Sequence, residues 1–167
     1  MMCAFSYYTE EKSIYNLDMF IRMTVQIRAL AEASNDYIPL LSNASALLNE
    51  NLENINWVGF YLVKNDALQL GPFQGKIACV NIEKGKGVCG TAFEKDEVIV
   101  VEDVHQFPGH IACDVASNSE IVIPLHRDGK VVAVLDIDSP LTGRFEKKDR
   151  DGLVAFAKVL EDLINWD

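Results

Sequence analysis

The apolar positions of the first fifty residues recur at helical spacing. Between residues 14 and 33 they include Leu17, Phe20, Ile21, Val25, Ile27 and Leu30. A second stripe within residues 38–52 consists of Leu40, Leu41, Ala44, Leu47 and Leu48. Because a helix brings such positions onto one face, the pattern predicts two helices. Residues 1–12 are expected to form a loosely held extension before them.

From residue 56 onward, apolar and polar positions alternate instead, as they do along a strand. Short strands are predicted over residues 56–63, 68–70, 76–82, 98–101, 120–125 and 130–138. A glycine-rich turn at 85–92 leads into a short helix, and a final helix is predicted over 147–164. The chain is therefore expected to form one α+β domain over residues 1–167, with helices bracketing an antiparallel sheet.

The last two strands place acidic residues on one face of the predicted sheet. The odd-numbered positions of this hairpin are apolar, whereas the even-numbered positions include Glu120, Asp136 and Asp138. Asp136 and Asp138 are thus expected on one face, roughly 7 Å apart along the strand. A three-residue loop at 127–129, with Gly129 in a left-handed bulge, would pair Glu120 with Asp136. We predict this loop because a two-residue turn would put Glu120 on the opposite face.

Three converging carboxylates have a limited set of uses. Crowding and partial burial raise the pKa of at least one of them. Such a cluster binds a cation, accepts an ammonium group or keeps a proton for general-acid catalysis. The alternative is that Asp136 and Asp138 only end an edge strand in water.

Aromatic residues line one face of the strand predicted at 56–63. Trp57 and Tyr61 share that face, and Gly59 leaves room between them. They are expected either to form an aromatic wall beside a pocket or to belong to the core.

Composition narrows the function classes. Hydrophobic residues make up 49% of the chain and charged residues 24%, which is typical of a globular protein. The net charge of −10 argues against nucleic-acid and anionic-membrane partners. The apolar stretches are too short to span a membrane, and the N-terminus does not resemble a signal peptide. A cytoplasmic location is therefore expected.

The four cysteines, at positions 3, 79, 89 and 113, form no closely spaced pair. A structural disulfide framework is not expected in a cytoplasmic protein, which leaves inert thiols, a metal site or redox chemistry. A zinc set of Cys79, Cys89, Cys113 and His110 lacks the tight pairs that such sites use, so no metal is expected. Cys113 and His110 lie in a long irregular loop at 103–119, and such loops are usually functional. A nearby histidine would lower the pKa of the Cys113 thiol.

Several longer strings carry a resemblance to a known family. They are NWVGFY (56–61), LGPFQG (70–75), GKGVCG (85–90), DVH (103–105), GHIACD (109–114), SNSEIV (117–122) and LDIDS (135–139). Over roughly residues 40–163 the chain resembles the free methionine-R-sulfoxide reductases, which are stand-alone members of the GAF-domain superfamily. The resemblance implies a GAF-like fold, with a central antiparallel sheet of about six strands flanked by helices.

The resemblance also implies a mechanism that needs no cofactor. Cys113 would attack the sulfoxide sulfur, release methionine and become a sulfenic acid. A resolving cysteine, Cys79 as first choice and Cys89 as second, would then form a disulfide that thioredoxin reduces. Family members are often homodimers, so a homodimer is possible here.

A role for the carboxylates follows from combining the resemblance with the chemistry of a sulfoxide. Protonation of the oxygen makes the sulfur electrophilic, so an acid is needed beside the thiolate. We assign this role, and binding of the substrate ammonium group, jointly to Glu120, Asp136 and Asp138. Trp57 and Tyr61 would enclose the methylsulfinyl end.

Three other functions remain open from the sequence. They are a GAF sensor that binds a small ligand without turnover, a zinc-binding structural protein and a reductase of protein-bound methionine sulfoxide. The acidic residues argue against the last, because a peptide nitrogen carries no positive charge.

Overall fold

A six-stranded antiparallel sheet forms the centre of the computed structural model, which describes residues 4–109 and 114–166. The strand order is β3-β2-β1-β6-β5-β4. The strands are β1 (Trp57–Lys64), β2 (Ala67–Gly75), β3 (Asn81–Glu83), β4 (Ile99–Val101), β5 (Ser119–Arg127) and β6 (Lys130–Ser139). The expected α+β fold with a sheet of about six strands is confirmed.

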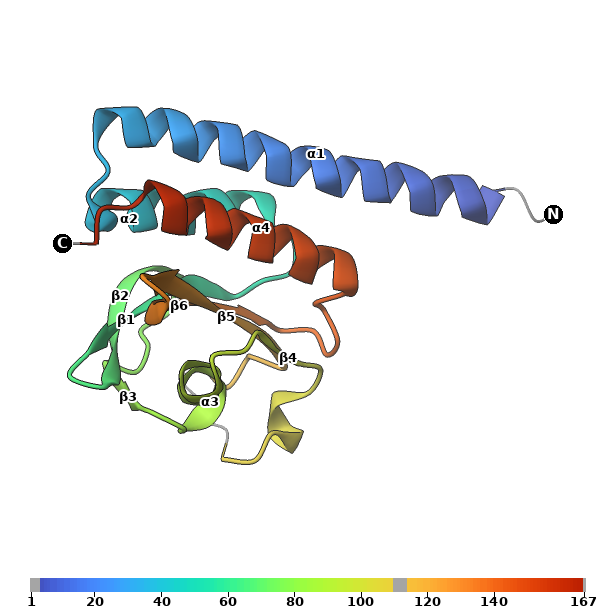
Figure 1. The fold of residues 1–167 in the computed structure, drawn as a ribbon. Helices are drawn as coiled ribbons and strands as arrows, with labels where there is room; N and C mark the ends of the chain where they lie inside the picture. Colours follow the sequence, from blue (N-terminus) through green and yellow to red (C-terminus); the bar gives the residue numbers. More distant parts are fainter. Residues whose placement is uncertain (1–3, 110–113, 167) are drawn as a thin grey trace.

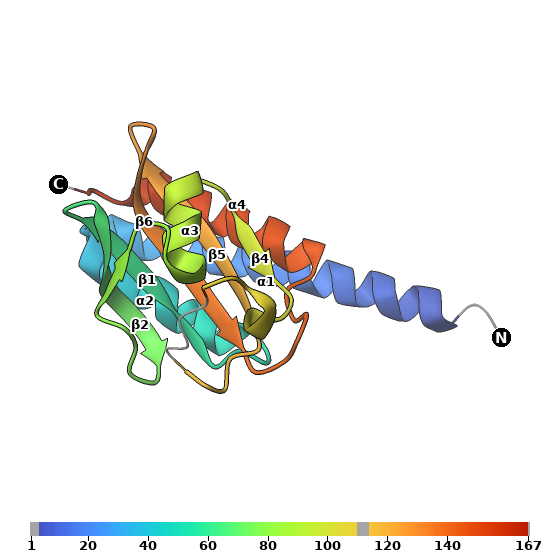
Figure 2. The same cartoon turned by 90° about the horizontal axis from the view of Figure 1, so that it is seen from below.

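Helices lie on both sides of this sheet. α2 (Tyr37–Asn51) and α4 (Lys147–Leu163) cover one face, and α1 (Ala4–Ala33) packs on the outside of both (Figure 1). The short helix α3 (Gly87–Lys95) lies on the opposite face, across β5 and β6 (Figure 2). A 3₁₀ turn, η1 (Val104–Gln106), follows β4. The sheet is therefore covered on both faces.

Each face of the sheet has its own apolar core, because successive side chains of a strand point to opposite sides. Val58, Phe60 and Leu135 pack toward α2 and α4. Tyr61 and Val134 belong to a second cluster on the side of α3. This alternation places every second residue of β1, β5 and β6 beneath α3, where the acidic residues also lie.

The first helix begins earlier than the sequence pattern indicated. α1 starts at Ala4, so residues 4–12 are helical and continue the helix that was expected from residue 14. The segment contains neither Gly nor Pro between Ala4 and Ala33, so nothing in it interrupts a helix. Its N-terminal end projects beyond α4 (Figure 1). Among the described residues, none of the helices is both long and apolar enough to cross a membrane.

The β5–β6 hairpin differs from the expected one. Its turn has two residues, Asp128 and Gly129, both with positive φ (52° and 72°), which suits the twist of a hairpin. A bulge then leaves Val132 unpaired, because Leu125 pairs with Ala133 and His126 with Val131. The three-residue loop and the pairing of Glu120 with Asp136 were therefore wrong.

The bulge nevertheless preserves the predicted faces. Turn and bulge together put Glu120 opposite Asp138, a shift of two residues from the expected partner Asp136. A shift of two keeps every side chain on the same face, whereas a shift of one reverses it. Glu120, Asp136 and Asp138 therefore all belong to the side of the sheet covered by α3.

The strand expected at 76–82 is mostly absent. β2 runs to Gly75, where a positive φ of 136° turns the chain away, and only Asn81–Glu83 forms a strand. Cys79 thus lies in a connection between strands, not in a strand as expected. Such a segment is more accessible to a second protein than the middle of a sheet.

Candidate active site

A pocket opens between the sheet, α3 and the segments around residues 76–82 and 114–117. It is lined by Trp57, Tyr61, Ile77, Ala78, Ile82, Lys86, Gly87, Val88, Cys89, Asp114, Ser117, Glu120, Asp136 and Asp138. All five residues predicted from the sequence to bind substrate are in this set, which the sheet brings together from β1, β5 and β6.

An aromatic wall forms one side of the pocket. Trp57 stacks on Tyr61 at a centroid distance of 5.9 Å and on Phe73 at 5.3 Å. The indole nitrogen of Trp57 donates a hydrogen bond to the carbonyl of Lys76 (3.1 Å), which fixes the ring. A Cβ at Gly59 would stand 2.7 Å from the Trp57 ring, so glycine is needed there. Burial, followed by the neighbouring charges, raises the pKa of Tyr61, so its hydroxyl remains protonated.

Beside the aromatic wall, the pocket carries three carboxyl groups. Glu120 comes from β5, and Asp136 and Asp138 come from β6, two residues apart and on one face. Glu120 and Asp136 are each only 6% exposed. The β1 residues opposite Asp136 and Asp138 are Gly59 and Trp57, so the acidic and aromatic walls meet across this strand pair.

Burial raises the pKa of all three carboxyl groups. For Asp136 it brings the pKa to about 6. Glu120 is also buried beside Asp136 and Asp138, and its pKa is raised well above the usual range. Burial and the charge of Asp136 do the same for Asp138. Because the groups interact, they titrate as a set that retains protons near neutral pH.

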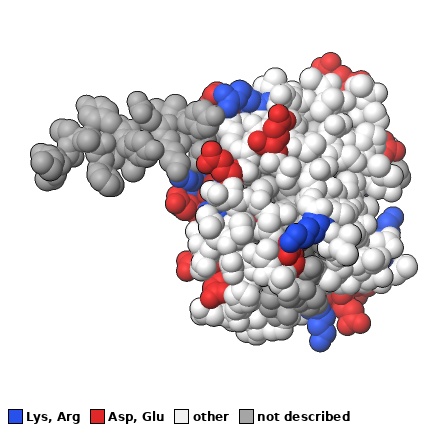
Figure 3. All heavy atoms as spheres, turned by 180° about the vertical axis from the view of Figure 1, so that it is seen from behind, with Lys and Arg blue, Asp and Glu red and all other residues white. Residues whose placement is uncertain are grey.

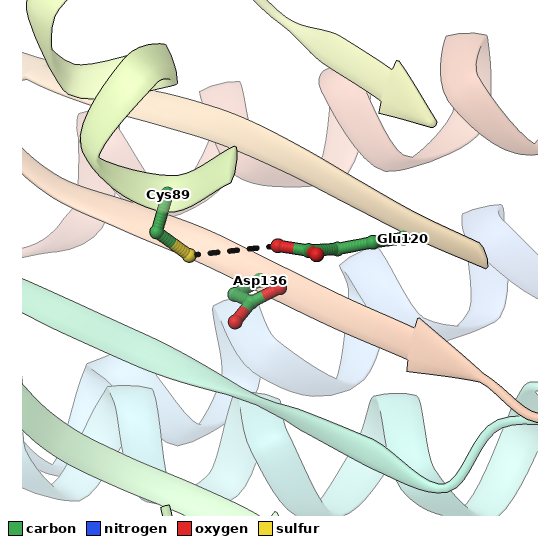
Figure 4. A group of neighbouring side chains, drawn as sticks. All are labelled: Cys89, Glu120 and Asp136. Carbon is green, nitrogen blue, oxygen red and sulfur yellow. Dashed lines mark hydrogen bonds between the residues drawn. The ribbon is translucent and has the colours of Figure 1, made fainter. Parts of the chain in front are cut away.

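Cys89 lies at the base of this acidic wall. It is in the first turn of α3, is 4% exposed, and its sulfur lies 3.8 Å from a carboxylate oxygen of Glu120 (Figure 4). Burial raises the pKa of the Cys89 thiol, and the charges of Asp136 and Glu120 raise it further. Cys89 is therefore a protonated thiol, which is a weak nucleophile.

The N-terminus of α3 gives the pocket a positive end. Lys86, Gly87 and Val88 line the pocket at that point, and Lys86 caps the helix without a side-chain hydrogen bond. The first backbone N–H groups of a helix have no acceptor within it and attract anions. The pocket therefore presents carboxyl groups on one side and helix N–H groups on another, which suits a ligand with both charges.

The chain is similar to known proteins over most of its length. The GAF domain family matches residues 40–165. The free methionine-R-sulfoxide reductase of Escherichia coli is 50% identical over 147 residues, which cover 88% of this chain and 89% of the relative. The chain belongs to the free methionine-R-sulfoxide reductase family.

Solved structures of free methionine-R-sulfoxide reductases have the same fold. The reduced form of fRMsr of Staphylococcus aureus superposes with a TM-score of 0.84 at 52% identity, covering 87% of this chain and 95% of that one. The free methionine-R-sulfoxide reductase of Neisseria meningitidis, in complex with its substrate, gives a TM-score of 0.81 at 43% identity, with 86% of each chain covered. The family resemblance inferred from the sequence motifs is thus confirmed.

The cysteines of this member of the reductase family differ in state. Cys79 is disulfide-bonded, whereas Cys89 is a free, buried thiol. Cys113, expected to be the nucleophile, and His110 lie outside the described residues. The roles predicted for the three cysteines and for the substrate-binding residues therefore stay predictions.

A polar network that the sequence analysis missed holds the segment beyond Cys113. The amide nitrogen of Asn56 donates to a carboxylate oxygen of Asp114 (3.2 Å) and to the hydroxyl of Ser117 (3.0 Å). Lys76 reaches Asp114 at 3.3 Å, and the Ala116 N–H donates to it at 2.9 Å. These hydrogen bonds lower the pKa of Asp114 and keep it ionised, with the Ala116 N–H the largest cause. The network ties residues 114–117 to the start of β1.

Charged side chains elsewhere are dispersed. On the face shown in Figure 3, the acidic and basic residues of the described part occur singly or in small mixed groups. Such a distribution differs from the continuous basic stripe that tracks a nucleic-acid backbone.

Proposed function

We propose that this protein reduces free L-methionine-R-sulfoxide to L-methionine, with Cys113 as the attacking thiolate. The observation that carries the proposal is the pocket, in which the buried carboxyl groups of Glu120 and Asp136 and the partly buried one of Asp138 lie beside an aromatic wall in a chain of this reductase family. Among the open alternatives, enzyme action fits better than ligand sensing because the pocket contains proton donors.

The pocket matches the parts of the substrate. Its ammonium group pairs with the acidic cluster of Glu120, Asp136 and Asp138. The methyl and sulfinyl groups lie against Trp57 and Tyr61, which exclude water from the reacting sulfur. The substrate carboxylate takes backbone N–H groups, from the 109–119 loop or from the first turn of α3. A methionine within a polypeptide has no ammonium group to offer, so the free amino acid is preferred.

The reaction balances with groups of this chain and one external reductant. The Cys113 sulfur attacks the sulfoxide sulfur, and a carboxyl group of the acidic cluster protonates the oxygen. The hydroxyl group then passes to the Cys113 sulfur as the new sulfur–sulfur bond and the substrate sulfur–oxygen bond break, which releases methionine and leaves Cys113 as a sulfenic acid. A second thiol then attacks that sulfur, which releases water and forms a disulfide. The dithiol of thioredoxin reduces the disulfide and restores both thiols.

Cys79 is our choice as resolving cysteine. Cys79 belongs to a disulfide and lies in a connection between strands, and both observations support that role. Cys89 is free, buried and protonated beside Glu120, so it is poorly suited to attack a sulfenic acid. Recycling by thioredoxin requires a reducing compartment, which supports the cytoplasm as its location.

A homodimer is also part of the proposal. The outer face of α1 exposes Ile21 (53%) and Val25 (61%), one helical turn apart. Exposed apolar residues in such a row commonly mark an interface. Light scattering on the full chain should give twice the monomer mass, and Val25→Lys should reduce it. A monomer mass for the unaltered chain would contradict the dimer.

A turnover assay tests the proposed reaction. Purified protein is incubated with thioredoxin, thioredoxin reductase, NADPH and either epimer of free methionine sulfoxide. Only the R epimer should consume NADPH, and Cys113→Ser should abolish consumption. Cys79→Ser should release one methionine per chain and then stop, since its sulfenic acid cannot be resolved. Substrate binding without turnover, even with a small dithiol, would favour the sensor instead.

A further inference from the structure

Three potential metal ligands converge at the base of the pocket. The sulfur of Cys89 and carboxylate oxygens of Glu120 and Asp136 all lie within 4.8 Å of one another. They come from three different elements, α3, β5 and β6, and point toward a common space (Figure 4). All three residues are buried, so the backbone that carries them is held by packing on both sides.

The spacing is close to that of a tetrahedral zinc site. Zinc–sulfur bonds of about 2.3 Å and zinc–oxygen bonds of about 2.0–2.2 Å at tetrahedral angles place sulfur and oxygen roughly 3.5 Å apart. The sulfur of Cys89 and the nearest oxygen of Glu120 are 3.8 Å apart. For this pair, a small side-chain rotation therefore suffices to reach the spacing of two zinc ligands.

An unsatisfied oxygen points to a missing cationic partner. Oδ1 of Asp136 is fully buried and has no hydrogen-bond partner among the described residues, and the residue as a whole is 6% exposed. Buried carboxylate oxygens are nearly always bonded, because leaving one unpaired is costly. The residue that carries this oxygen is one of the three that converge with the sulfur of Cys89.

We propose that Cys89, Glu120 and Asp136 bind one Zn²⁺ ion, with its fourth position open to the pocket, and that this ion excludes the substrate. The zinc site itself rests only on the ligand geometry. The exclusion of the substrate rests on the proposed function, in which the same carboxylates bind the substrate ammonium group. This set differs from the zinc set weighed from the sequence, whose member Cys79 is in a disulfide.

Zinc binding exchanges protons of the ligands for the metal ion. The zinc–sulfur bond forms as the Cys89 thiol loses its proton to solvent, and the carboxyl groups release any proton they share. Two positive charges then replace the lost protons in a cluster of three acidic ligands. Because protons are released, affinity rises with pH. The fourth ligand is water, as in other sites with three protein ligands.

Cadmium titration of the disulfide form tests the site directly. In that form the proposed Cys113–Cys79 pairing leaves only Cys89 and Cys3 as free thiols, which a thiol count on denatured protein verifies. One equivalent of Cd²⁺ should produce the ultraviolet charge-transfer band of a cadmium–thiolate bond. Cys89→Ser should remove the band, whereas the matched variant Cys3→Ser should retain it.

Calorimetry with Zn²⁺ supplies the second readout. Glu120→Gln, which keeps the thiol, should weaken zinc binding by at least about tenfold. It also serves if Cys89→Ser fails to fold. Free methionine-R-sulfoxide should weaken the apparent affinity of the unaltered protein. A full cadmium band in Cys89→Ser, or unchanged zinc affinity in Glu120→Gln, would overturn the site.

Different results would contradict the zinc site and the proposed function. Zinc binding is measured without turnover, so a protein that binds one ion at Cys89 yet reduces no sulfoxide loses only the proposed function. A protein that reduces the R epimer but shows no cadmium–thiolate band loses only the zinc site. Binding of zinc without any effect on substrate binding would overturn the exclusion step.

Discussion

Glu120 on β5 lies directly opposite Asp138 on β6, so two carboxyl groups are neighbours on one face of the sheet. Like charges at such positions destabilise a sheet when both are ionised. Burial raises the pKa of each group, and the charge of Asp136 raises both further. The cluster therefore keeps protons near neutral pH, and the same property lets it act as an acid.

Glu120→Gln should lower the reductase activity and raise the stability of the fold. Removing one acidic group relieves the repulsion, so we expect the free energy of unfolding at pH 8 to rise by about 1 kcal/mol. The reductase rate should fall at least about a hundredfold, as expected when a general acid is removed. Urea unfolding and the NADPH-coupled assay measure the two effects. The exposed Glu97→Gln is the control and should change neither; a destabilised Glu120→Gln would show that this residue makes net favourable contacts.

Asp136 should make the fold less stable as the pH rises. Its pKa is raised to about 6 in the folded chain from the ordinary value of 3.8, so the folded state binds the proton more tightly. This contribution is complete below pH 4 and is lost as the pH rises through about 6. Asp136→Asn does not titrate there, so its stability relative to the unaltered protein should improve by on the order of 2 kcal/mol between pH 4 and pH 8. Urea unfolding at both pH values measures the difference, and a pH-independent difference would contradict the assigned pKa.

The strand periodicity was enough to predict which residues share the pocket wall. Glu120, Asp136 and Asp138 fall on one face because their parity along β5 and β6 determines it. The cross-strand partner was not predictable in the same way, since a bulge at Val132 follows the turn. A bulge depends on the local twist and packing and leaves no distinct mark in the hydrophobic pattern.

The sequence analysis did not identify residues whose contacts form only in the folded chain. Asn56 and Lys76 meet Asp114 only after the chain has folded, from positions 58 and 38 residues away. Their polar side chains are ordinary for loops, so nothing in the local pattern marks them. The placement of Cys89 under the carboxylates also arises from the packing of α3 on β5 and β6.

Gly59→Ala should disturb the aromatic wall. The new Cβ would lie 2.3 Å from the Cβ of Phe73 and 2.7 Å from the Trp57 ring, so both must move. We expect a loss of about 1–3 kcal/mol in stability and a higher KM for the sulfoxide, because the Trp57 ring that is proposed to enclose the sulfoxide is displaced. Tryptophan fluorescence and steady-state kinetics measure the change.

Gly152→Ala is the matched control for that variant. Its Cβ would meet the ring of Phe20 at 2.3 Å, away from the pocket. It should lower stability in a similar range without raising KM. Equal effects of the two variants on KM would show that the Gly59 result reflects general destabilisation.

His126 should stabilise the fold more at low pH than at high pH. Its ring nitrogens contact Asp96 at the end of α3 (2.6 Å) and Glu161 of α4 (2.8 Å), so it links helices on opposite faces of the sheet. Burial lowers the pKa of His126, but the two acidic partners outweigh it, and the net pKa is raised. Its contribution is present below pH 6.5 and is lost as the pH rises through the folded pKa.

His126→Gln tests this link. The variant should lose about 0.5–1 kcal/mol at pH 6, since partial exposure screens the ion pairs, and less at pH 9. Thermal unfolding at both values measures it. His105→Gln is the control, because the ring contact that it removes is to the amide oxygen of Asn118 (3.0 Å). An equal loss for His126→Gln at pH 6 and pH 9 would contradict the role of the charged form.

Asn56→Ala should impair catalysis more than folding, because Asn56 holds the segment that follows Cys113. Its amide bridges Asp114 and Ser117, and its backbone N–H donates to the carbonyl of Asp138 (3.0 Å). Only the side-chain bonds are lost in the variant, at a cost of about 1–2 kcal/mol.

Residues 114–117 then lose part of their attachment to the start of β1, and we expect the proposed nucleophile Cys113, which precedes them in the sequence, to be held less well for attack on the substrate sulfur. Misplacement of a reacting group by about 1 Å can cost a hundredfold in rate, so we expect kcat to fall by about ten- to a hundredfold. Steady-state kinetics of the R epimer measures this fall. Asn51→Ala removes one comparable bond, from the Asn51 amide to Leu47, in the remote helix α2. An equal fall in kcat in both variants would mean that the network around Asn56 does not position the nucleophile.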